Sequence, residues 1–248
     1  FDLSTGIGSL GHTPVLNWSP LPGAFGNYFR VPSLVGSLSL GMDGVALAFF
    51  ANATLPTITV KQNFLSFGAF PSFGLPGPNM IVSLSQQVSG AVPSVSMRFF
   101  GSLQLGDVSS ALAPPALSVS GLLDPFGVSE LQLSTLAPWS PLPSLPMLSA
   151  PALTGKLFMD VPSSSLNVSV TNVDPIALSV PHVGDLTDWW VTLSASIPDL
   201  MNLSQAVILP SLRGSVKLGL LNDLSLDVFG EFDLSTGIGS LGHTPVLN

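Results

Sequence analysis

Three glycines near the start of the chain have the spacing most often linked to chemistry. Gly6, Gly8 and Gly11 match the G-x-G-x-x-G pattern of a dinucleotide-binding loop. Such a loop needs a helix that opens at its last glycine, because the helix N-terminus supplies the N–H groups that hold a pyrophosphate. After Gly11 the sequence reads HTPVLNWSPLP, and its prolines do not favour a helix. We therefore interpret these glycines as turn and bulge residues and expect no cofactor.

Histidines and carboxylates are too scattered to predict a catalytic or metal site. His12, His182 and His243 have no second histidine four positions away, and no G-x-S-x-G motif marks a nucleophile. The chain has no cysteine, which excludes thiol catalysis, disulfides and zinc–thiolate sites. Asp185 and Asp188 offer oxygen ligands for a cation, but we interpret them as a solvated turn before a strand. The sequence thus predicts neither an enzyme nor a metal centre.

N-glycosylation sequons are the functional motif that exceeds its chance frequency. The pattern Asn-x-Ser/Thr occurs at Asn17, Asn52, Asn167 and Asn202. The serine and threonine content of the chain predicts about 1.7 such motifs by chance. Strand periodicity places Asn52 and Asn167 on polar faces, where a glycan leaves the core undisturbed. We therefore predict covalent N-glycans at these four asparagines.

Period-two alternation of apolar and polar residues predicts the elements that carry these motifs. It is clearest in Leu224–Ser235 and Val95–Leu105, and it recurs at Leu166–Val170 and Val191–Ile197. Helical spacing is scarce, and Asp199–Leu209 is the best candidate for a short helix. The sequence therefore predicts an all-β protein with antiparallel sheets, either as β-sandwiches or as elongated β-sheet modules.

A long internal duplication suggests how these strands are organised. Residues 1–17 and 232–248 are identical, at a spacing of 231 positions. We interpret them as parts of a tandem array, with an engineered duplication as the alternative. Within the 231-residue repeat, WSPLP occurs at Trp18 and again at Trp139. This predicts a tail of a preceding repeat at 1–17 and two related β half-repeats, at 18–138 and 139–248.

The junction between repeats has no flexible linker in the sequence. We expect Phe232–Ser240 to continue straight from the strand Leu224–Glu231, because the alternation stays in phase through Leu234. The following HTPVLNWSPLP would then form a stiff, extended connection. This predicts a rigid junction, in which neighbouring repeats of the same chain or fibre are the partners.

The composition narrows the class of protein and its surroundings. Only 8% of the residues are charged, whereas ordinary soluble domains have about 25%. Six lysines and arginines cannot form a basic patch, so nucleic acid is not an expected partner. No stretch reaches the roughly 18 apolar residues of a membrane-spanning helix, and no transmembrane segment is expected in this stretch. Long strands with so little charge tend to pair edge to edge, unless glycans cover them or fibre formation uses them.

These observations favour a structural repeat unit of an extracellular, glycosylated fibril, stalk or cell-surface filament. The alternative is an elongated β-groove protein that binds lipid or another hydrophobic ligand. Its basis is the segment GSVKLGLLNDLSLDVFGEFDLSTG, which resembles the repetitive β-groove proteins that carry lipids. In the structural hypothesis the apolar faces close on each other, whereas in the lipid hypothesis they line a continuous groove.

Overall fold

The fold is all-β, and antiparallel strands account for most of the described residues. None of the described residues forms an α-helix. The computed structural model describes residues 7–10, 18–31, 35–41, 44–69, 74, 76–87, 94–107, 109–110, 113–135, 137–140, 149–180, 184–218, 224–232 and 239–247.

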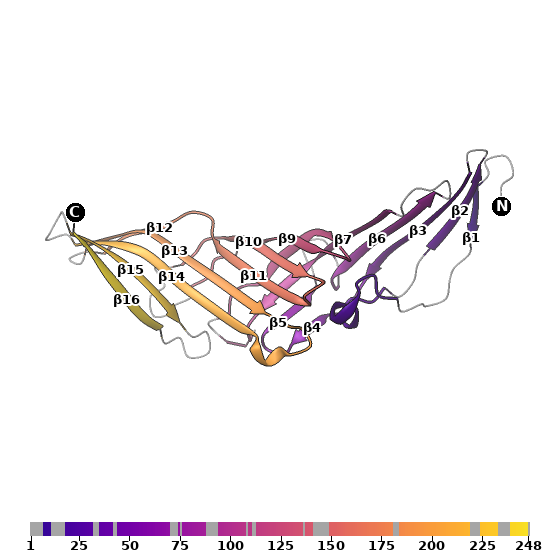
Figure 1. Cartoon of the computed structure of the whole chain (residues 1–248). Helices are drawn as coiled ribbons and strands as arrows, with labels where there is room; N and C mark the ends of the chain where they lie inside the picture. The colour runs from indigo at the N-terminus through magenta and orange to yellow at the C-terminus, as the bar shows by residue number, and fades with distance from the viewer. Residues whose placement is uncertain are drawn as a thin grey trace.

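Sixteen strands form a single sheet (Figure 1) in which every pairing is antiparallel. The strands are β1 (Ile7–Leu10), β2 (Val35–Gly41), β3 (Gly44–Thr54), β4 (Ile58–Lys61), β5 (Leu65–Gly68), β6 (Asn79–Gln87), β7 (Ser94–Leu105), β8 (Leu117–Leu123), β9 (Val128–Thr135), β10 (Leu153–Asp160), β11 (Ser165–Asn172), β12 (Ile176–Val180), β13 (Gly184–Ile197), β14 (Val207–Leu218), β15 (Leu224–Phe232) and β16 (Gly239–Leu247).

The chain follows a meander from one end of an elongated, twisted sheet to the other. β1 and β16 lie at the two opposite ends, as Figure 1 shows. Two short additions leave the main path, because β5 pairs with β7 beside β6, and β12 pairs with β13 beside β11. β4 completes a hairpin with β5. The observed form is therefore an elongated sheet.

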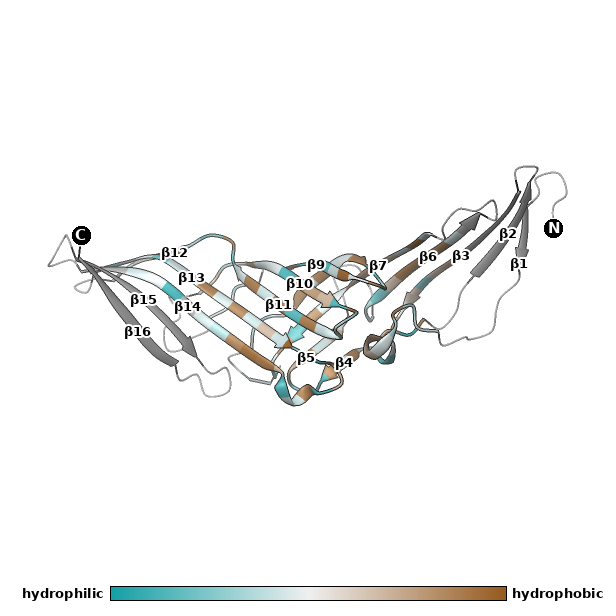
Figure 2. Ribbon diagram, in the orientation of Figure 1, coloured by the Kyte–Doolittle hydropathy of each residue, from teal (hydrophilic) through white to brown (hydrophobic). Residues whose placement is uncertain are grey.

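Alternation along the strands explains which face is buried. In β7, Met97, Phe99 and Leu103 are buried, while Ser96 and Arg98 between them are exposed. β9 and β11 show the same period-two pattern of burial. Figure 2 shows it as alternating brown and pale bands along the central strands. These observations confirm the strands predicted at Val95–Leu105 and Leu166–Val170.

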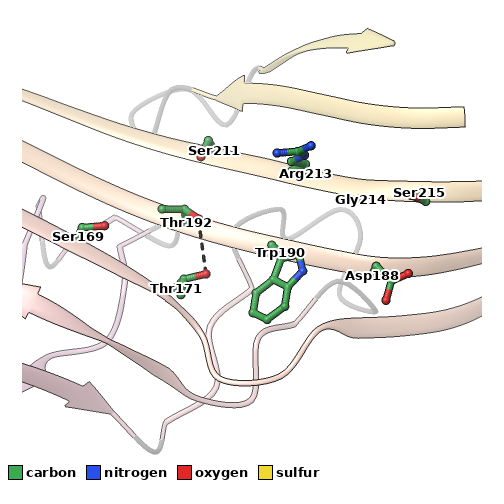
Figure 3. Close-up of a pocket in the computed structure, with 9 residues that line it drawn as sticks. All are labelled: Ser169, Thr171, Asp188, Trp190, Thr192, Ser211, Arg213, Gly214 and Ser215. Atoms are coloured by element: carbon green, nitrogen blue, oxygen red, sulfur yellow. Dashed lines mark hydrogen bonds between the residues drawn. The ribbon is translucent and has the colours of Figure 1, made fainter. Parts of the chain in front are cut away.

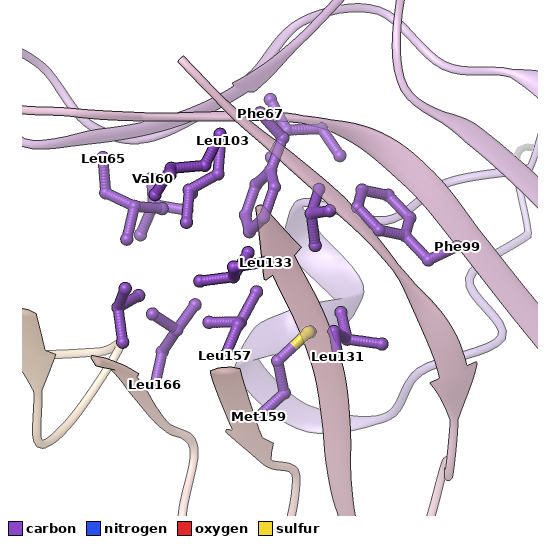
Figure 4. Packing of buried hydrophobic residues seen from close by; sticks show 14 of the residues in the cluster. Val60, Leu65, Phe67, Phe99, Leu103, Leu131, Leu133, Leu157, Met159 and Leu166 are labelled. Carbon is purple, nitrogen blue, oxygen red and sulfur yellow. The ribbon is translucent and has the colours of Figure 1, made fainter. Parts of the chain in front are cut away.

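The buried side chains of the central strands meet in one hydrophobic core. Those of β4, β5, β7 to β11 and β13 belong to a single cluster, part of which is drawn in Figure 4. Phe67 and Phe99 pack edge to face, with ring centroids 5.4 Å apart, and Phe29 lies 5.5 Å from Phe99. Burial of each such side chain contributes about 1.5–3 kcal/mol. The central part of the sheet therefore curls around its own apolar side chains.

Two short 3-10 turns help to close this curl. The first is η1 (Gly23–Asn27), which buries Ala24 and Phe25 against the core. The second is η3 (Leu203–Gln205), which lies between β13 and β14. The Nζ atom of Lys61 at the end of β4 donates a hydrogen bond of 3.0 Å to the carbonyl oxygen of Leu203. Segments far apart in the sequence thus meet where the curl closes.

The helix predicted at Asp199–Leu209 is wrong. This segment forms η3 and then the first residues of β14, where Val207 pairs with Ser196 and Leu209 with Ser194. Pairing with β13 outweighs a weak local helical preference. Pro210 is compatible with this strand, because β15 pairs with β14 only from Ser211 onward and leaves that edge open before it.

The straight continuation expected for Phe232–Ser240 is also wrong. β15 ends at Phe232, and β16 begins at Gly239 and runs back along it, with Phe232 opposite Gly239 and Leu224 opposite Leu247. Pairing with its neighbour gives β16 a full ladder of main-chain hydrogen bonds, which a straight extension lacks. HTPVL of the second copy is therefore part of a strand at the edge of the sheet, where Pro245 is tolerated.

The sheet passes without a break across the boundary expected at residues 138 and 139. β9 and β10 pair along eight residues there, from Leu153 opposite Thr135 to Asp160 opposite Val128. Each half also contains an isolated antiparallel bridge with two main-chain hydrogen bonds. Trp18 pairs with Val31 in the first half, and Trp139 pairs with Ala150 in the second. The tryptophans that begin the two WSPLP segments therefore have the same local pairing.

Candidate functional site

Three of the four sequon asparagines are exposed. Asn52 lies in β3, Asn167 lies in β11, and Asn202 lies in the turn before η3. Their neighbours Ala51, Ala53, Leu166 and Val168 are buried, which places Asn52 and Asn167 on the polar face as predicted. Asn17 lies outside the described residues.

At each of these three sites, the side-chain carbonyl oxygen accepts a hydrogen bond. Oδ1 of Asn52 accepts from Nδ2 of Asn79 at 3.0 Å, and Oδ1 of Asn167 accepts from Oγ of Ser196 at 2.7 Å. Among the described residues, no hydrogen bond engages Nδ2 of Asn52, Asn167 or Asn202. Nδ2 is the atom to which an N-glycan is attached, so that atom remains accessible.

Asn202 has a different setting from the two strand sites. Its Oδ1 accepts hydrogen bonds from the main-chain N–H of Ser204 at 3.3 Å and from the hydroxyl of Ser204 at 2.6 Å. The asparagine and the hydroxyl residue of this sequon therefore face each other in an Asx turn, which also begins η3. In β3 and β11 the partner hydroxyls, on Thr54 and Ser169, are exposed on the same face as their asparagines.

The other residues with chemical potential do not come together. Gly8 lies within β1, so it is a strand residue, while Gly6 and Gly11 are outside the described residues. His12 and His182 are also outside them, and the side chain of His243 in β16 is not described. Among the described side chains, no three histidines or carboxylates are close enough to hold a metal ion.

The turn expected at Asp185 and Asp188 is wrong, because both lie inside β13. Between the pairs Thr187–Ser215 and Trp190–Arg213, two residues of β13 face one residue of β14, which is a β-bulge. Asp188 is the first of these two residues and has a φ of 57°. Aspartate tolerates this left-handed conformation better than most residues do.

A depression of about 640 Å³ lies on the polar face beside this bulge. We call it the Trp190 groove; its lining includes Thr171 of β11, Asp188, Trp190 and Thr192 of β13, and Ser211 and Arg213 of β14 (Figure 3). This groove was not among the sites predicted from the sequence. The signal that was available is the pair Trp189–Trp190, since adjacent strand residues face opposite sides of a sheet and both cannot be core residues.

Charged residues are few in the sequence, and most of those whose side chains the structure describes are exposed. Lys156 Nζ lies 2.7 Å from Glu130 Oε1, with both side chains about half exposed. The pKa of Asp107 is lowered, first by the hydrogen bond from the main-chain N–H of Ser109 and then by the bond from its hydroxyl. These contacts stabilise a loop and do not assemble a catalytic group.

Comparison with known proteins gives no relative. No protein family matches the chain, and neither a curated protein nor a solved structure does. Within the described part of the chain, no helix has the length and apolar character needed to span a membrane.

Proposed function

We propose that this chain is a structural repeat unit of an extracellular, glycosylated fibril, stalk or cell-surface filament. The observation that carries the proposal is that both ends of the sheet contain the same residues. β1 consists of residues 7–10, and residues 239–241, which are the copies of residues 8–10, belong to β16 at the opposite edge. β16, at one end of the sheet, therefore contains the same residues that pair with β2 at the other end.

The ladder between β1 and β2 supplies the register for joining two units. Gly8 lies opposite Leu38, and Leu10 lies opposite Gly36. Because Gly239 and Leu241 are the copies of Gly8 and Leu10, β16 can pair with β2 of a neighbouring unit in the same register. Such pairing satisfies main-chain groups at an edge that otherwise invites aggregation.

The middle of the sheet contains a pairing that supports this junction. β9 pairs with β8 on one side and with β10 on the other. In the β9–β10 ladder Leu133 lies opposite Gly155, as Leu10 lies opposite Gly36 in the β1–β2 ladder. The isolated bridge at Trp139 accompanies the β9–β10 ladder, and the bridge at Trp18 accompanies the β1–β2 ladder. We infer that β16 pairs with β2 of the next unit in the same way as β9 pairs with β10. Each 231-residue repeat then consists of two related halves.

Burial of the apolar side chains favours this function over lipid binding. In β7 to β11 and in β13 the inward-facing side chains are almost completely buried, with Phe99, Leu131 and Leu157 each at 0% exposure. A lipid groove needs an open apolar surface, whereas these side chains pack against one another. N-glycans at Asn17, Asn52, Asn167 and Asn202 would supply the hydration that a chain with 8% charged residues lacks.

The experiment compares a protein of one 231-residue unit with a protein of two joined units. We expect a higher urea midpoint for the two-unit protein, because the new interface stabilises both neighbours. Electron microscopy should show a fixed angle between units. The matched control is Ser240→Pro made in both proteins, because Ser240 also pairs with Glu231 of β15 inside the unit. It removes one main-chain donor and should lower the two-unit midpoint more than the one-unit midpoint.

Two outcomes would contradict the proposal. The first is an equal midpoint for the one-unit and two-unit proteins, together with freely variable angles between units. The second is saturable uptake of a fluorescent fatty acid by the two-unit protein, which would favour the lipid-binding alternative. Neither result depends on whether the natural protein is glycosylated.

A further inference from the structure

The Trp190 groove has features that the fibril proposal does not use. It lies on the polar face over β11, β13 and β14. Trp190 is 37% exposed, whereas its neighbour Trp189 is 5% exposed and belongs to the core. A large aromatic ring left on the solvent side of a sheet is a common feature of binding surfaces.

The β-bulge at Asp188 and Trp189 sets the position of Trp190. It brings Trp190 directly opposite Arg213 of β14, with Asp188 close by in β13 (Figure 3). Bulges occur frequently beside functional sites, where they redirect a side chain. Left-handed backbone at a residue other than glycine costs about 1–3 kcal/mol and persists where the surroundings hold it in place. The strain at Asp188 therefore needs a structural support.

A buried asparagine provides that support. Asn172 is 1% exposed, and its Nδ2 donates to the carbonyl oxygen of Trp189 at 3.2 Å. Its Oδ1 accepts from the main-chain N–H of Val191 at 2.7 Å. The side-chain amide of Asn172, the last residue of β11, thus binds the main chain on both sides of Trp190. Trp190 is therefore held on a rigid stretch of backbone.

The inner face of the bulge is fixed as well. A Cβ atom on Gly214 would lie 2.4 Å from the Trp189 ring, so the indole packs directly on the β14 backbone. Trp189 is held inward and Trp190 outward by the same local arrangement. The groove is therefore a preorganised surface rather than a chance gap between side chains.

Two charged side chains beside Trp190, those of Arg213 and Asp188, are available to a ligand. Within the described residues, the guanidinium of Arg213 and the carboxylate of Asp188 form no ion pair or side-chain hydrogen bond. Arg213 supplies up to five N–H donors, and Asp188 supplies acceptors. The Thr171 hydroxyl donates to the carbonyl oxygen of Val191 at 3.2 Å and accepts from the Thr192 hydroxyl at 3.5 Å, so both threonine oxygens can still accept a hydrogen bond from a ligand. The site combines one aromatic ring, one cation, one anion and a row of hydroxyls.

We propose that the Trp190 groove binds a neutral glycan. A pyranose ring has an apolar face of C–H groups that fits an exposed indole, and hydroxyls around its rim that both donate and accept. Arg213 donates to adjacent hydroxyls of the sugar, Asp188 accepts from them, and the threonine hydroxyls bind the remainder. A depression with one apolar surface and a few fixed polar groups is typical of small-ligand sites. This glycan-binding proposal does not depend on whether the units form a fibril.

The test uses the whole 248-residue chain made in bacteria, where no N-glycan is attached. Isothermal titration and tryptophan fluorescence measure binding of three soluble probes: a high-mannose N-glycan, cellohexaose and laminarihexaose. We expect saturable binding of at least one probe, with a shift in tryptophan emission. Preference for the N-glycan would mean that the groove holds sugars on neighbouring units, and preference for a glucan would mean a separate polysaccharide.

Variants separate the site from general effects. Trp190→Ala and Arg213→Ala should each weaken binding about tenfold or more, since each removes one principal contact. Both side chains are exposed, so the urea midpoint should stay within error of the unmodified chain. Trp190→Phe keeps an aromatic ring and should retain part of the affinity.

The matched control is Arg30→Ala. Arg30 is exposed beside Tyr28 and Thr57 in a second depression, whose lining contains no tryptophan and no carboxylate, so its loss should leave binding unchanged. The proposal is overturned if no probe binds saturably up to about 10 mM, a limit that corresponds to an interaction too weak for a specific site. It is equally overturned if binding persists undiminished in Trp190→Ala.

Discussion

The ammonium group of Lys61 donates a hydrogen bond of 3.0 Å to the carbonyl oxygen of Leu203, which lies 142 positions further along the chain. Lys61 Nζ also lies 5.0 Å from the centroid of the Phe64 ring. This bond joins β4 to η3 across the opening of the curled sheet. It links the half-repeat 18–138 to the half-repeat 139–248 through a side chain, not through main-chain pairing between strands.

Replacing Lys61 with methionine tests how much this closure contributes. Lys61→Met keeps the aliphatic stem but removes the charge, and we expect a loss of about 1–2 kcal/mol in the free energy of unfolding, measured in urea. Lys156→Met is the control, because its ion pair with Glu130 is half exposed and should contribute less than about 1 kcal/mol. Equal effects of the two substitutions would show that the curl closes without Lys61.

The aromatic cluster should dominate the stability of the core. Phe99 is fully buried and lies within 5.5 Å of two other phenylalanine rings, counted between centroids. Phe99→Ala should lower the free energy of unfolding by about 3–5 kcal/mol, because it removes buried contacts and leaves a cavity. Phe126→Ala, at a residue 77% exposed, should change it by less than about 0.5 kcal/mol. A small loss for Phe99→Ala would contradict the central core.

Gly214 should not tolerate a side chain. An added Cβ would lie 2.4 Å from the Trp189 ring, so Gly214→Ala should cost about 1–3 kcal/mol in unfolding free energy. In the background of Trp189→Leu the same change should cost clearly less. Gly68→Ala is the control, since its nearest atom is the Ser102 hydroxyl oxygen at 3.4 Å. Strictly additive effects of the two changes would mean that Trp189 does not pack on Gly214.

Natural material should have N-glycans at the exposed sequons. Peptide mass spectrometry should find sugar on Asn52, Asn167 and Asn202, because each Nδ2 is accessible. In a secreted recombinant chain, Thr54→Ala should abolish the glycan at Asn52 and leave the other sites modified. Finding every sequon unmodified in native protein would remove the argument for a secretory compartment.

The loop at Asp107 should show a measurable shift in acid titration. Hydrogen bonds from the N–H and hydroxyl of Ser109 lower the pKa of Asp107. A lowered pKa in the folded state stabilises the fold above the ordinary aspartate pKa, and this contribution is lost as the pH falls through the lowered value. Ser109→Ala should bring the pKa part of the way back, since the larger main-chain contribution remains. NMR titration of the carboxyl carbon measures this, and an unchanged midpoint would refute the assignment.

Local periodicity was sufficient to predict the fold class and the polar-face positions of Asn52 and Asn167. Each of these depends on alternation over a few residues, which a strand imposes directly. The direction of the chain after Phe232 was not predictable in this way, because alternation continues equally well into a straight strand or a hairpin. The segment Asp199–Leu209 was misread because the spacing of apolar residues within it takes no account of pairing with the preceding strand, β13.

The Trp190 groove illustrates a deeper limit on sequence analysis. The groove depends on Asn172 of β11, the bulge of β13 and Arg213 of β14. Because these residues come from three different strands, the sequence of one strand does not predict the groove. The bulge itself depends on a left-handed Asp188, which a period-two reading treats as an ordinary polar position. Strand alternation places the two adjacent tryptophans on opposite faces, but the residues that lie beside Trp190 follow only from the register between strands.

The meander path determines how this sheet would respond to a pulling force. Tension applied between β1 and β16 acts across the strands, along the hydrogen bonds that join them. Those bonds then open one after another, rather than all at once as in shear. A strand of 11 residues such as β3 occupies about 4.8 Å of sheet width but about 36 Å when extended. The length that each released strand contributes therefore increases severalfold, and the sheet acts as an extensible spring whose strands can rejoin their sequence neighbours when the load falls.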